Sequence, residues 1–365
     1  MRALPPHIAE QAADTHCYVY DLSMLRVRVA EACGLVDDYF YPVKANPEPD
    51  LVRAAVDAGA GLDLSSRGDL EVALSSGADP SRCSFTSANL DESMCMALLA
   101  AAIDVDLDSA DQVALWLRLG GRDAGLRICT ADPVSPYGSK FGLRSDAVQQ
   151  AVELISSSGG RITGLHLHDM HADVTPEAMT DGILSVLESV PEGIVHRCER
   201  INIGGGWPMP DGVPATVSDL APALERLRLR LKAYGFQGKL AAEPGEWVVG
   251  PCGWLPGRVS AVKPHPVYPG RLVVVLDVAT PVPCRASRSA FAVVRGKAHV
   301  EISADIECCD VYGSANTGLD TVGLAVHLPR PQVGDVVVSS GQGAYSRQLV
   351  GTFNERPTPG AMVLH

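Results

Sequence analysis

Short apolar runs alternate with helix-like stretches from about residue 18 to residue 255, and this alternation restricts the possible folds more than any other feature. The series starts with CYVYDL and SMLRVRVAEACG, continues with YFYPVKA and PDLVRAAVDAGA, and ends with ERINIGGGW, SDLAPALERLRLRLKAYG and KLAAEPGEWVVG. Strands that alternate with helices predict parallel βα units. The number of units favours a (β/α)8 TIM-type barrel over an open sheet.

The pattern changes after about residue 256. LVVVLDVATPVP, AFAVVRGKAHVEIS and DVVVSSGQGAY are typical of strands separated by polar turns, and no helical period lies between them. We therefore expect a barrel domain over residues 18–255 and an all-β domain formed by residues 256–365 together with residues 1–17.

Composition excludes several classes of function. The 365 residues include 30 basic and 43 acidic side chains, and the net charge of −13 argues against binding to nucleic acid, which requires a basic face. No run approaches the roughly 18 apolar residues of a membrane helix, and MRALPPHIAEQAADTH lacks the apolar core of a signal peptide. The ten cysteines include no CxxC pair. We expect reduced thiols, a cytoplasmic location and no membrane contact.

Four segments place polar or glycine residues at expected strand ends, where barrel enzymes carry their active sites. Lys44 ends YFYPVK, His168 ends GLHLH, Glu243 ends KLAAE, and Gly204, Gly205 and Gly206 follow ERINI. Each has an ordinary interpretation as a solvated lysine, a packed histidine, a loop carboxylate or a flexible turn. The glycines precede one further strand and so follow the seventh, where barrel phosphate sites usually form.

Together, these residues suit pyridoxal 5′-phosphate. A lysine can form a Schiff base, glycines can hold the phosphate, and a carboxylate can keep the pyridine nitrogen protonated. A zinc site is the alternative for His166, His168 and His171 with Asp169 and Asp173, but this spacing alone is weak, and we expect no metal.

The chain resembles the fold-type III pyridoxal-phosphate decarboxylases, the group that contains ornithine and diaminopimelate decarboxylases. The resemblance covers nearly the whole chain. Its motifs occur in the order YVYDL, YPVKAN, GLDLSSRGDLE, DVDLDS, LRI, SKFGL, GLHLH, INIGGGWP, EPGEWVV, VGDVVV, GAY and FN. Alanine racemases share the two-domain plan, but they resemble this chain less and place an arginine against the pyridine nitrogen.

The resemblance implies a role for each site residue. It makes Lys44 the Schiff-base lysine and His168 the imidazole that stacks on the ring. Glu243 would pair with the pyridine nitrogen. The remaining residues would contact the phosphate or support the lysine and ring, and these are Gly204, Gly205, Gly206, Tyr345, Asp63 and Arg127. The resemblance also implies a homodimer whose active sites are shared between subunits.

The chain departs from the family pattern at several positions. Met170 and His171 stand where the family has a Gly-Ser pair that touches phosphate, which makes His171 a candidate for cofactor binding. EPGE places Glu246 where the family has an arginine. Asn316 occupies the position of a cysteine that helps to protonate the product, while Asp320 matches the second aspartate of that motif. Cys308 and Cys309 are then two small strand residues.

Arg285 and Arg288 are candidates for binding a substrate carboxylate, since Arg285 matches a carboxylate-binding arginine of diaminopimelate decarboxylases. Because Glu246 replaces another arginine, we expect a substrate other than diaminopimelate. An amino acid joined to another acid, as in carboxylate siderophore biosynthesis, fits better. Three interpretations remain, which are an amino-acid decarboxylase, a racemase or epimerase on the same scaffold, and a non-catalytic pyridoxal-phosphate-binding protein.

Overall fold

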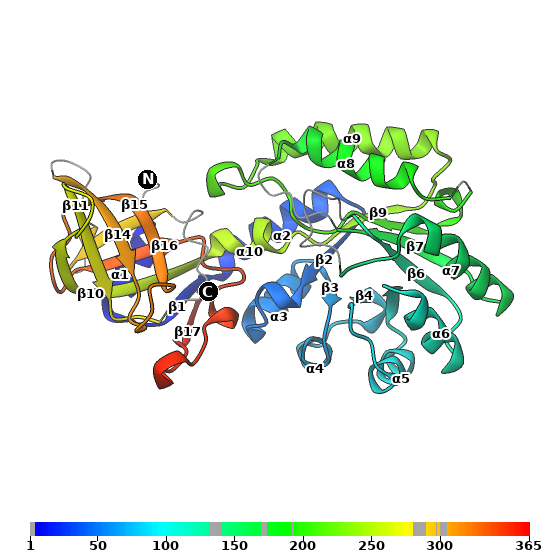
Figure 1. Ribbon diagram of the computed structural model, residues 1–365, viewed down its shortest axis with the longest axis horizontal. Coiled ribbons are helices and arrows are strands. Elements are labelled where there is room, and N and C mark those ends of the chain that lie inside the picture. Colours follow the sequence, from blue (N-terminus) through cyan, green and yellow to red (C-terminus); the bar gives the residue numbers. More distant parts are fainter. Residues whose placement is uncertain are drawn as a thin grey trace. The chain divides into compact units, whose positions relative to one another are not determined.

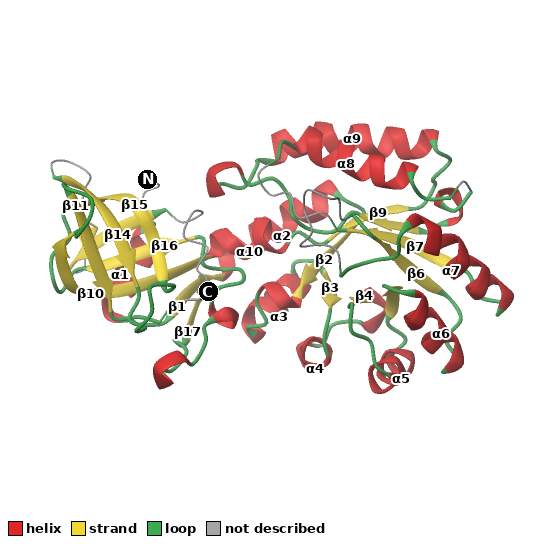
Figure 2. Cartoon of the chain, in the orientation of Figure 1, coloured by secondary structure: helices red, strands yellow, loops and turns green. Residues whose placement is uncertain are grey.

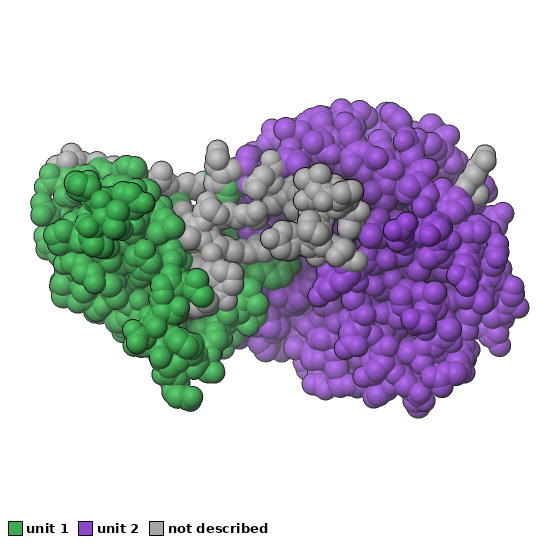
Figure 3. Space-filling view, in the orientation of Figure 1, with its two compact units in different colours: residues 1–25, 211–213, 249–365 green, residues 26–210, 214–248 purple. Residues whose placement is uncertain are grey.

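The computed structural model describes residues 4–130, 140–168, 174–191, 193–279, 290–296, 298–299 and 305–365. The chain divides into two compact units (Figure 3). The barrel unit consists of Arg26–Pro210 and Pro214–Val248, and the β unit consists of Met1–Leu25, Asp211–Val213 and Val249–His365.

The barrel unit is built on a closed ring of parallel strands, and the predicted (β/α)8 barrel is confirmed. Its strands are β2 (Asp38–Pro42), β3 (Gly61–Leu64), β4 (Cys83–Thr86), β5 (Asp104–Leu107), β6 (Ala124–Ile128), β7 (Ile162–Leu167), β8 (Arg200–Asn202) and β9 (Lys239–Ala242). The last strand, β9, pairs with β2 and closes the ring. Because all the strands run in one direction, their carboxyl ends meet at one rim.

Helices surround the barrel strands (Figure 2). They are α2 (Leu22–Leu35), α3 (Pro49–Asp57), α4 (Arg67–Ser76), α5 (Glu92–Ala101), α6 (Ala110–Arg118), α7 (Ser145–Ser157), α8 (Pro176–Glu188) and α9 (Val217–Ala233). Side-chain caps fix the start of several of them, since the oxygens of Ser66, Asp91 and Ser109 accept backbone N–H groups of the first turn. Thr216 and Asp219 form a reciprocal capping box at the start of α9.

The described residues of the β unit form a sheet of nine strands, which confirms the predicted second domain in its sheet character. Figure 1 labels several of these strands. The strands are β1 (Tyr18–Asp21), β10 (Gly253–Pro264), β11 (Arg271–Leu276), β12 (Phe291–Arg295), β13 (Ala298–His299), β14 (Ile306–Tyr312), β15 (Thr321–Pro329), β16 (Val336–Ser340) and β17 (Ala361–Leu364). Helix α1 (Pro6–Asp14) adds an element that the all-β prediction lacked. Ile8 and Ala12 of this helix pack in one apolar cluster with Trp254 and Val338 of the sheet.

Two runs taken from the sequence as barrel strands have other structures. The run CYVYDL forms β1, which pairs with β10 and β17 of the β unit rather than with the barrel. The barrel is already closed by eight strands and has no free edge for a ninth. After β9, GEWVV forms the short helix α10 (Gly245–Val249). The compact units therefore divide at Leu25/Arg26 and Val248/Val249, whereas the sequence placed the boundaries near residues 17 and 255.

Cys308 and Cys309 lie in strand β14, as expected, and Cys309 is buried. In the part of the chain that the structure describes, no helix is both long and apolar enough to cross a membrane.

Candidate active site

Lys44 follows β2 in a single turn of 3-10 helix, η1 (Val43–Ala45). Its Nζ donates a hydrogen bond to Oδ2 of Asp63 on the neighbouring strand β3 and lies 3.8 Å from Oε1 of Glu243. Both carboxylates are 1% exposed, whereas the Lys44 side chain is 34% exposed. The amine is thus anchored on buried carboxylates at the carboxyl rim and is still open to a ligand.

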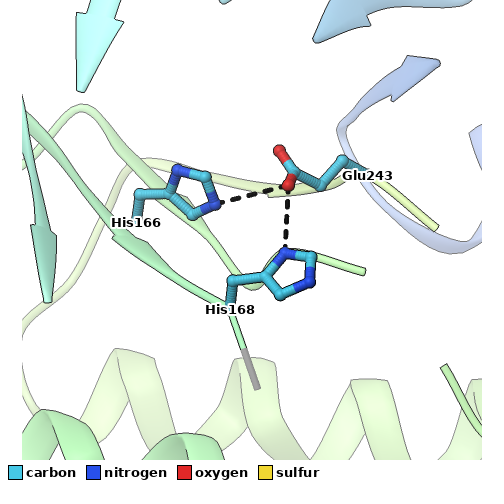
Figure 4. A group of neighbouring side chains, drawn as sticks. All are labelled: His166, His168 and Glu243. Carbon is cyan, nitrogen blue, oxygen red and sulfur yellow. Dashed lines mark hydrogen bonds and ion pairs between the residues drawn. The ribbon is translucent and has the colours of Figure 1, made fainter. Parts of the chain in front are cut away.

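Glu243, which directly follows β9, is the centre of the site. Its Oε1 lies 3.1 Å from Nδ1 of His168 and 3.5 Å from Nε2 of His166, and Figure 4 shows both imidazoles directed at this oxygen. Its Oε2 accepts a hydrogen bond of 3.2 Å from the Asn202 amide. Together with Lys44, four side chains therefore contact the Glu243 carboxylate.

The electrostatics of the site keep Glu243 charged. Burial alone would raise its pKa, but the nearby charges of His166 and Lys44 and the histidine contacts hold the pKa well below its usual range. Burial lowers the pKa of His168, which favours a neutral ring, although the contact with Glu243 opposes this shift. Burial and the charge of Glu243 raise the pKa of Asp63 in spite of the Lys44 contact.

The glycine run after β8 lies against the same residues. Gly204 and Gly206 have left-handed backbone angles, with φ of 69° and 70°, which favour glycine. A Cβ on Gly204 would lie 2.5 Å from the Leu167 carbonyl, and one on Gly205 would lie 2.9 Å from the Glu243 carbonyl. The run therefore packs backbone directly against His168 and Glu243, and the Gly205 N–H donates to Nδ1 of His168 at 3.3 Å.

Asp63 on β3 and Arg127 on β6 are both buried. Arg127 lies on β6, is 8% exposed, and stacks its guanidinium 4.3 Å from the ring centre of Phe141. Its Nη1 is 3.8 Å from Oδ2 of Asp108. Its positive charge also contributes to the lowered pKa of His168, so Arg127 acts electrostatically on the same site.

The remaining barrel candidate, Glu246, lies in the first turn of α10 and is half-buried. The other candidates that the structure describes lie in the β unit. Tyr345 is half-buried and has a positive φ of 50°. Asn316 is exposed, and its N–H donates to Oδ1 of Asn354 at 2.7 Å.

Asp320 has a clear local partner within the β unit. Its carboxylate is buried and accepts the Ala315 N–H at 2.7 Å, so it fixes the turn that carries Asn316. Burial raises its pKa. Three further candidates, His171, Arg285 and Arg288, lie outside the described residues.

The sequence interpretation missed two polar side chains that the structure places at the site. In the sequence, His166 is a candidate only for a zinc site, and Asn202 is not a candidate. Asn202 also accepts the Gly204 N–H at 2.8 Å, so it connects the carboxylate to the glycine run. In INIGGG and GLHLH, every second residue lies on the same face of its strand. Taking that face as the barrel interior could have indicated both Asn202 and His166.

His166, His168 and Glu243 are also the group of described residues whose geometry could hold a metal ion, with ligand atoms within 4.8 Å of one another. For this to happen, the facing nitrogens would have to offer lone pairs to the ion. Both nitrogens instead face the same Glu243 oxygen. In the structure these two nitrogens therefore contact the Glu243 carboxylate.

The residues present fit pyridoxal phosphate. An accessible amine, a carboxylate held in its charged form and a glycine cradle stand within one cluster on neighbouring barrel strands. The amine can react with the aldehyde of the cofactor, the carboxylate can pair with its protonated pyridine nitrogen, and the glycines let backbone approach its phosphate. Lys44, Glu243 and the Gly204–Gly206 run would hold these three groups.

Relatives share this architecture. A diaminopimelate decarboxylase from Deinococcus radiodurans is 28% identical over 377 residues, covering 98% of this chain and 93% of its own length. Protein TabA of Pseudomonas amygdali pv. tabaci is 27% identical over 350 residues, covering 89% of this chain and 79% of its own. The crystal structure of the Paramecium bursaria Chlorella virus arginine decarboxylase has the same fold, with a TM-score of 0.84, 20% identity and 98% coverage of both chains.

The family model described as "Pyridoxal-dependent decarboxylase, pyridoxal binding domain" matches residues 26–250, which are nearly the same residues as the barrel unit. The family model and the diaminopimelate decarboxylase relative favour decarboxylation over the racemase alternative and over a non-catalytic carrier. The chain therefore belongs to the pyridoxal-dependent decarboxylase family and is a pyridoxal-phosphate-dependent amino-acid decarboxylase.

Proposed function

We propose that decarboxylation takes place at the carboxyl rim of the barrel, with Lys44 as the covalent anchor of the cofactor and Glu243 as the partner of its pyridine nitrogen. The observation that carries this assignment is the convergence of Lys44 Nζ, Asp63 and Glu243 from three different strand ends. When bound, pyridoxal phosphate supplies an electron sink for the bonding pair that remains after carbon dioxide departs.

The chain's own residues would have distinct tasks. Asp63 orients the Lys44 amine, and Asn202, His166 and His168 fix the Glu243 carboxylate. The Gly204–Gly206 run would bind the phosphate through backbone N–H groups, with Tyr345 as a further contact. His168 would cover one face of the ring, since its imidazole is held at the rim by Glu243.

The overall reaction replaces a carboxylate on the α-carbon by a proton, so a proton donor is needed. Asn316 stands at the position of the family's cysteine, and an amide does not release a proton at neutral pH. We therefore assign the donor to Lys44, His171 or a bound water, and histidine is the best-matched acid near neutrality. Asn316 would instead hold a water or a substrate carbonyl by hydrogen bonds.

We propose that the substrate is an amino acid joined to a second acid, of the kind used in carboxylate siderophore biosynthesis. Two features of the sequence support a substrate other than diaminopimelate. Glu246 replaces an anion-binding arginine, and Arg285 and Arg288 offer guanidinium groups for a carboxylate elsewhere. A homodimer in which the Asn316–Asp320 turn completes the partner's site, and a cytoplasmic location, stay predictions.

Product analysis tests this proposal. The purified, cofactor-loaded enzyme is incubated in heavy water with a panel of amino acids and citryl–amino acid conjugates, and the products are identified by mass spectrometry. We expect loss of carbon dioxide from a conjugate and one deuterium at the former α-carbon of the amine. Turnover of diaminopimelate alone would contradict the substrate assignment. Amino acid recovered with α-deuterium and no amine would contradict decarboxylation.

A further inference from the structure

His166 is a fully buried histidine on β7 that is held between two carboxylates. Its Nδ1 lies 3.3 Å from Oδ2 of Asp106, and its Nε2 lies 3.5 Å from Oε1 of Glu243. Both carboxylates are 1% exposed, so water cannot replace either partner. A neutral imidazole has one N–H and no charge, whereas an imidazolium presents an N–H and a positive charge to both carboxylates.

The barrel is built to allow the contact between Asp106 and His166. Asp106 on β5 is paired in register with Gly125 on β6, the strand that separates β5 from β7. A Cβ on Gly125 would lie 1.9 Å from Oδ1 of Asp106. The missing side chain therefore leaves the space that the carboxylate occupies on its way to His166.

Asp106 also contacts a cation, the guanidinium of Arg200. Nη2 of Arg200 is 3.6 Å from Oδ1 of Asp106, and Nη1 of the same residue is 3.1 Å from Oδ2 of Asp104. Arg200, Asp106, His166 and Glu243 thus alternate in charge across the barrel interior if His166 is protonated. Such alternation is required for burying these ions together, because an unpaired buried charge is costly.

Further charged groups act on His166 and its partners. The cations are Lys44, Arg127, Lys140 and Arg200, the carboxylates are Asp63, Asp106, Asp108 and Glu243, and burial favours the neutral ring of His168. Burial alone would lower the pKa of His166, but Glu243 and Asp106 outweigh it and raise the pKa to about 9. Charge and geometry therefore agree on an imidazolium at neutral pH.

We propose that His166 is a positioning residue which, as an imidazolium clamped by Asp106, keeps the Glu243 carboxylate ionised and directed at the cofactor site. This inference rests on the proposed role of Glu243. His166 does not contact the reacting atoms in this scheme. It acts through Glu243, and Asp106, backed by Arg200, acts through His166.

The first test uses the cofactor-free protein, so it does not depend on turnover. Histidine Cε1–H resonances are titrated by NMR, and the His166 signal is identified by its loss in His166→Gln. We expect its midpoint near 9, as the raised pKa requires, and a lower midpoint in Asp106→Asn. A midpoint at or below 7 overturns the proposal. If His166→Gln does not fold, the signal that moves in Asp106→Asn identifies His166, and the absence of any such signal overturns the proposal.

The second test separates positioning from structure in the loaded enzyme. His166→Gln should lower kcat by about 10- to 100-fold with little change in KM, the usual range when a partner that orients a functional group is removed. The exposed His196→Gln is the matched control and should leave kcat unchanged. An unchanged kcat in His166→Gln overturns the inference. If Glu243→Gln is fully active as well, the proposed role of Glu243 has failed instead.

Discussion

The barrel unit and the β unit use buried charges differently. In the barrel unit, Lys44, Asp63, His166 and Glu243 come from four different strands and contact one another at one rim. In the described part of the β unit, the buried carboxylates pair with nearby groups of the same unit. Asp310 pairs with Arg271 of the adjacent strand, and Asp335 pairs with Arg295.

The difference follows from the closure of the parallel barrel. A closed parallel barrel brings the carboxyl ends of all its strands to one rim, so polar residues far apart in sequence meet there. In the β unit polar side chains pair across adjacent strands in either direction, since most neighbouring strands are antiparallel but Asp310 and Arg271 lie on the parallel neighbours β14 and β11. The β-unit candidates accordingly lie in irregular segments, as the positive φ of Tyr345 illustrates. We expect chemistry to depend on barrel charges and assembly to depend on β-unit turns.

The largest effect is expected at Lys44. Lys44→Ala should abolish covalent capture of the cofactor and lower kcat by more than about 1,000-fold, because no other group in the described site offers an amine. Borohydride reduction followed by peptide mass spectrometry measures the capture. A reduced adduct on a different lysine of the wild-type protein would contradict the assignment.

Glu243→Gln keeps the shape of the side chain and removes its charge. If the carboxylate stabilises charge that develops on the cofactor, kcat should fall by about 100- to 1,000-fold, the range for removal of one preorganised electrostatic partner. Cofactor affinity, measured by fluorescence titration, should change far less. Equal losses in affinity and in kcat would show that Glu243 acts in binding alone.

Mixing two inactive variants tests the division of labour between the units. Lys44→Ala removes a barrel residue, and Asp320→Ala removes the carboxylate that fixes the Asn316 turn in the β unit. In a dimer with shared sites, hybrids contain one intact site, so random exchange should restore about a quarter of wild-type activity. Mass spectrometry of intact dimers verifies the exchange. No recovery after verified exchange would place both residues in a site formed by one subunit.

Much of the barrel could be predicted from sequence, because the alternation of apolar strands and amphipathic helices is a local pattern. The number of barrel strands was the feature that the sequence alone predicted least well. The sequence offers nine strand-like runs, and only closure of the ring, a long-range property, excludes the run that forms β1. The turn from β9 into α10 was missed because GEWVVG is apolar enough for either element.

Lys44 and Glu243, which the structure brings within 3.8 Å of each other, could be named from the sequence because each residue type suggests one chemical role, and those roles stay predictions. The supporting contacts were not, because they depend on register between strands. His166 meets Asp106 across β6 only because Gly125 opens the space, and no local pattern records that relationship. Asn202 likewise belongs to the site because it donates a hydrogen bond to Glu243, 41 residues further along the chain.

Two histidines of the barrel, two positions apart, should have opposite effects on stability as the pH changes. Burial lowers the pKa of His168, so the unfolded chain binds more protons below about pH 6.5, and stability falls as the pH falls from there. The pKa of His166 is raised to about 9, so its contribution is full below about pH 6.5 and is lost as the pH rises through 9. Thermal unfolding of the cofactor-free protein at a series of pH values measures both losses of stability, the one at low pH (the acid limb) and the one at high pH (the alkaline limb).

We expect His168→Gln to flatten the acid limb, between pH 5 and about 6.5, and to leave the alkaline limb unchanged. His166→Gln should flatten the alkaline limb instead. The exposed His196→Gln serves as the control and should follow the wild-type curve at every pH. An acid limb that is unchanged in His168→Gln would show that His168 is protonated in the folded protein.

The smallest effect on activity is expected from Asp335, a purely local partner in the β unit. Its carboxylate is 4% exposed and accepts two hydrogen bonds of 2.8 Å from Arg295 and one of 2.8 Å from the Gln332 N–H. Asp335→Ala should lower the free energy of unfolding by about 2–3 kcal/mol, since hydrogen bonds to a charged group are lost. Glu199→Ala, which breaks an exposed pair with Arg161, should cost less than about 1 kcal/mol.

Activity distinguishes the two units in the same experiment. At a temperature where the Asp335→Ala protein is folded, borohydride should trap as much cofactor on Lys44 as in the wild type, and kcat should be within about twofold, because Asp335 pairs only with local groups. Circular dichroism establishes the folded fraction, and Glu199→Ala sets the variation expected from a surface change. Full folding with lost cofactor capture would mean that a buried charge of the β unit supports the barrel site, and the contrast between the units would no longer hold.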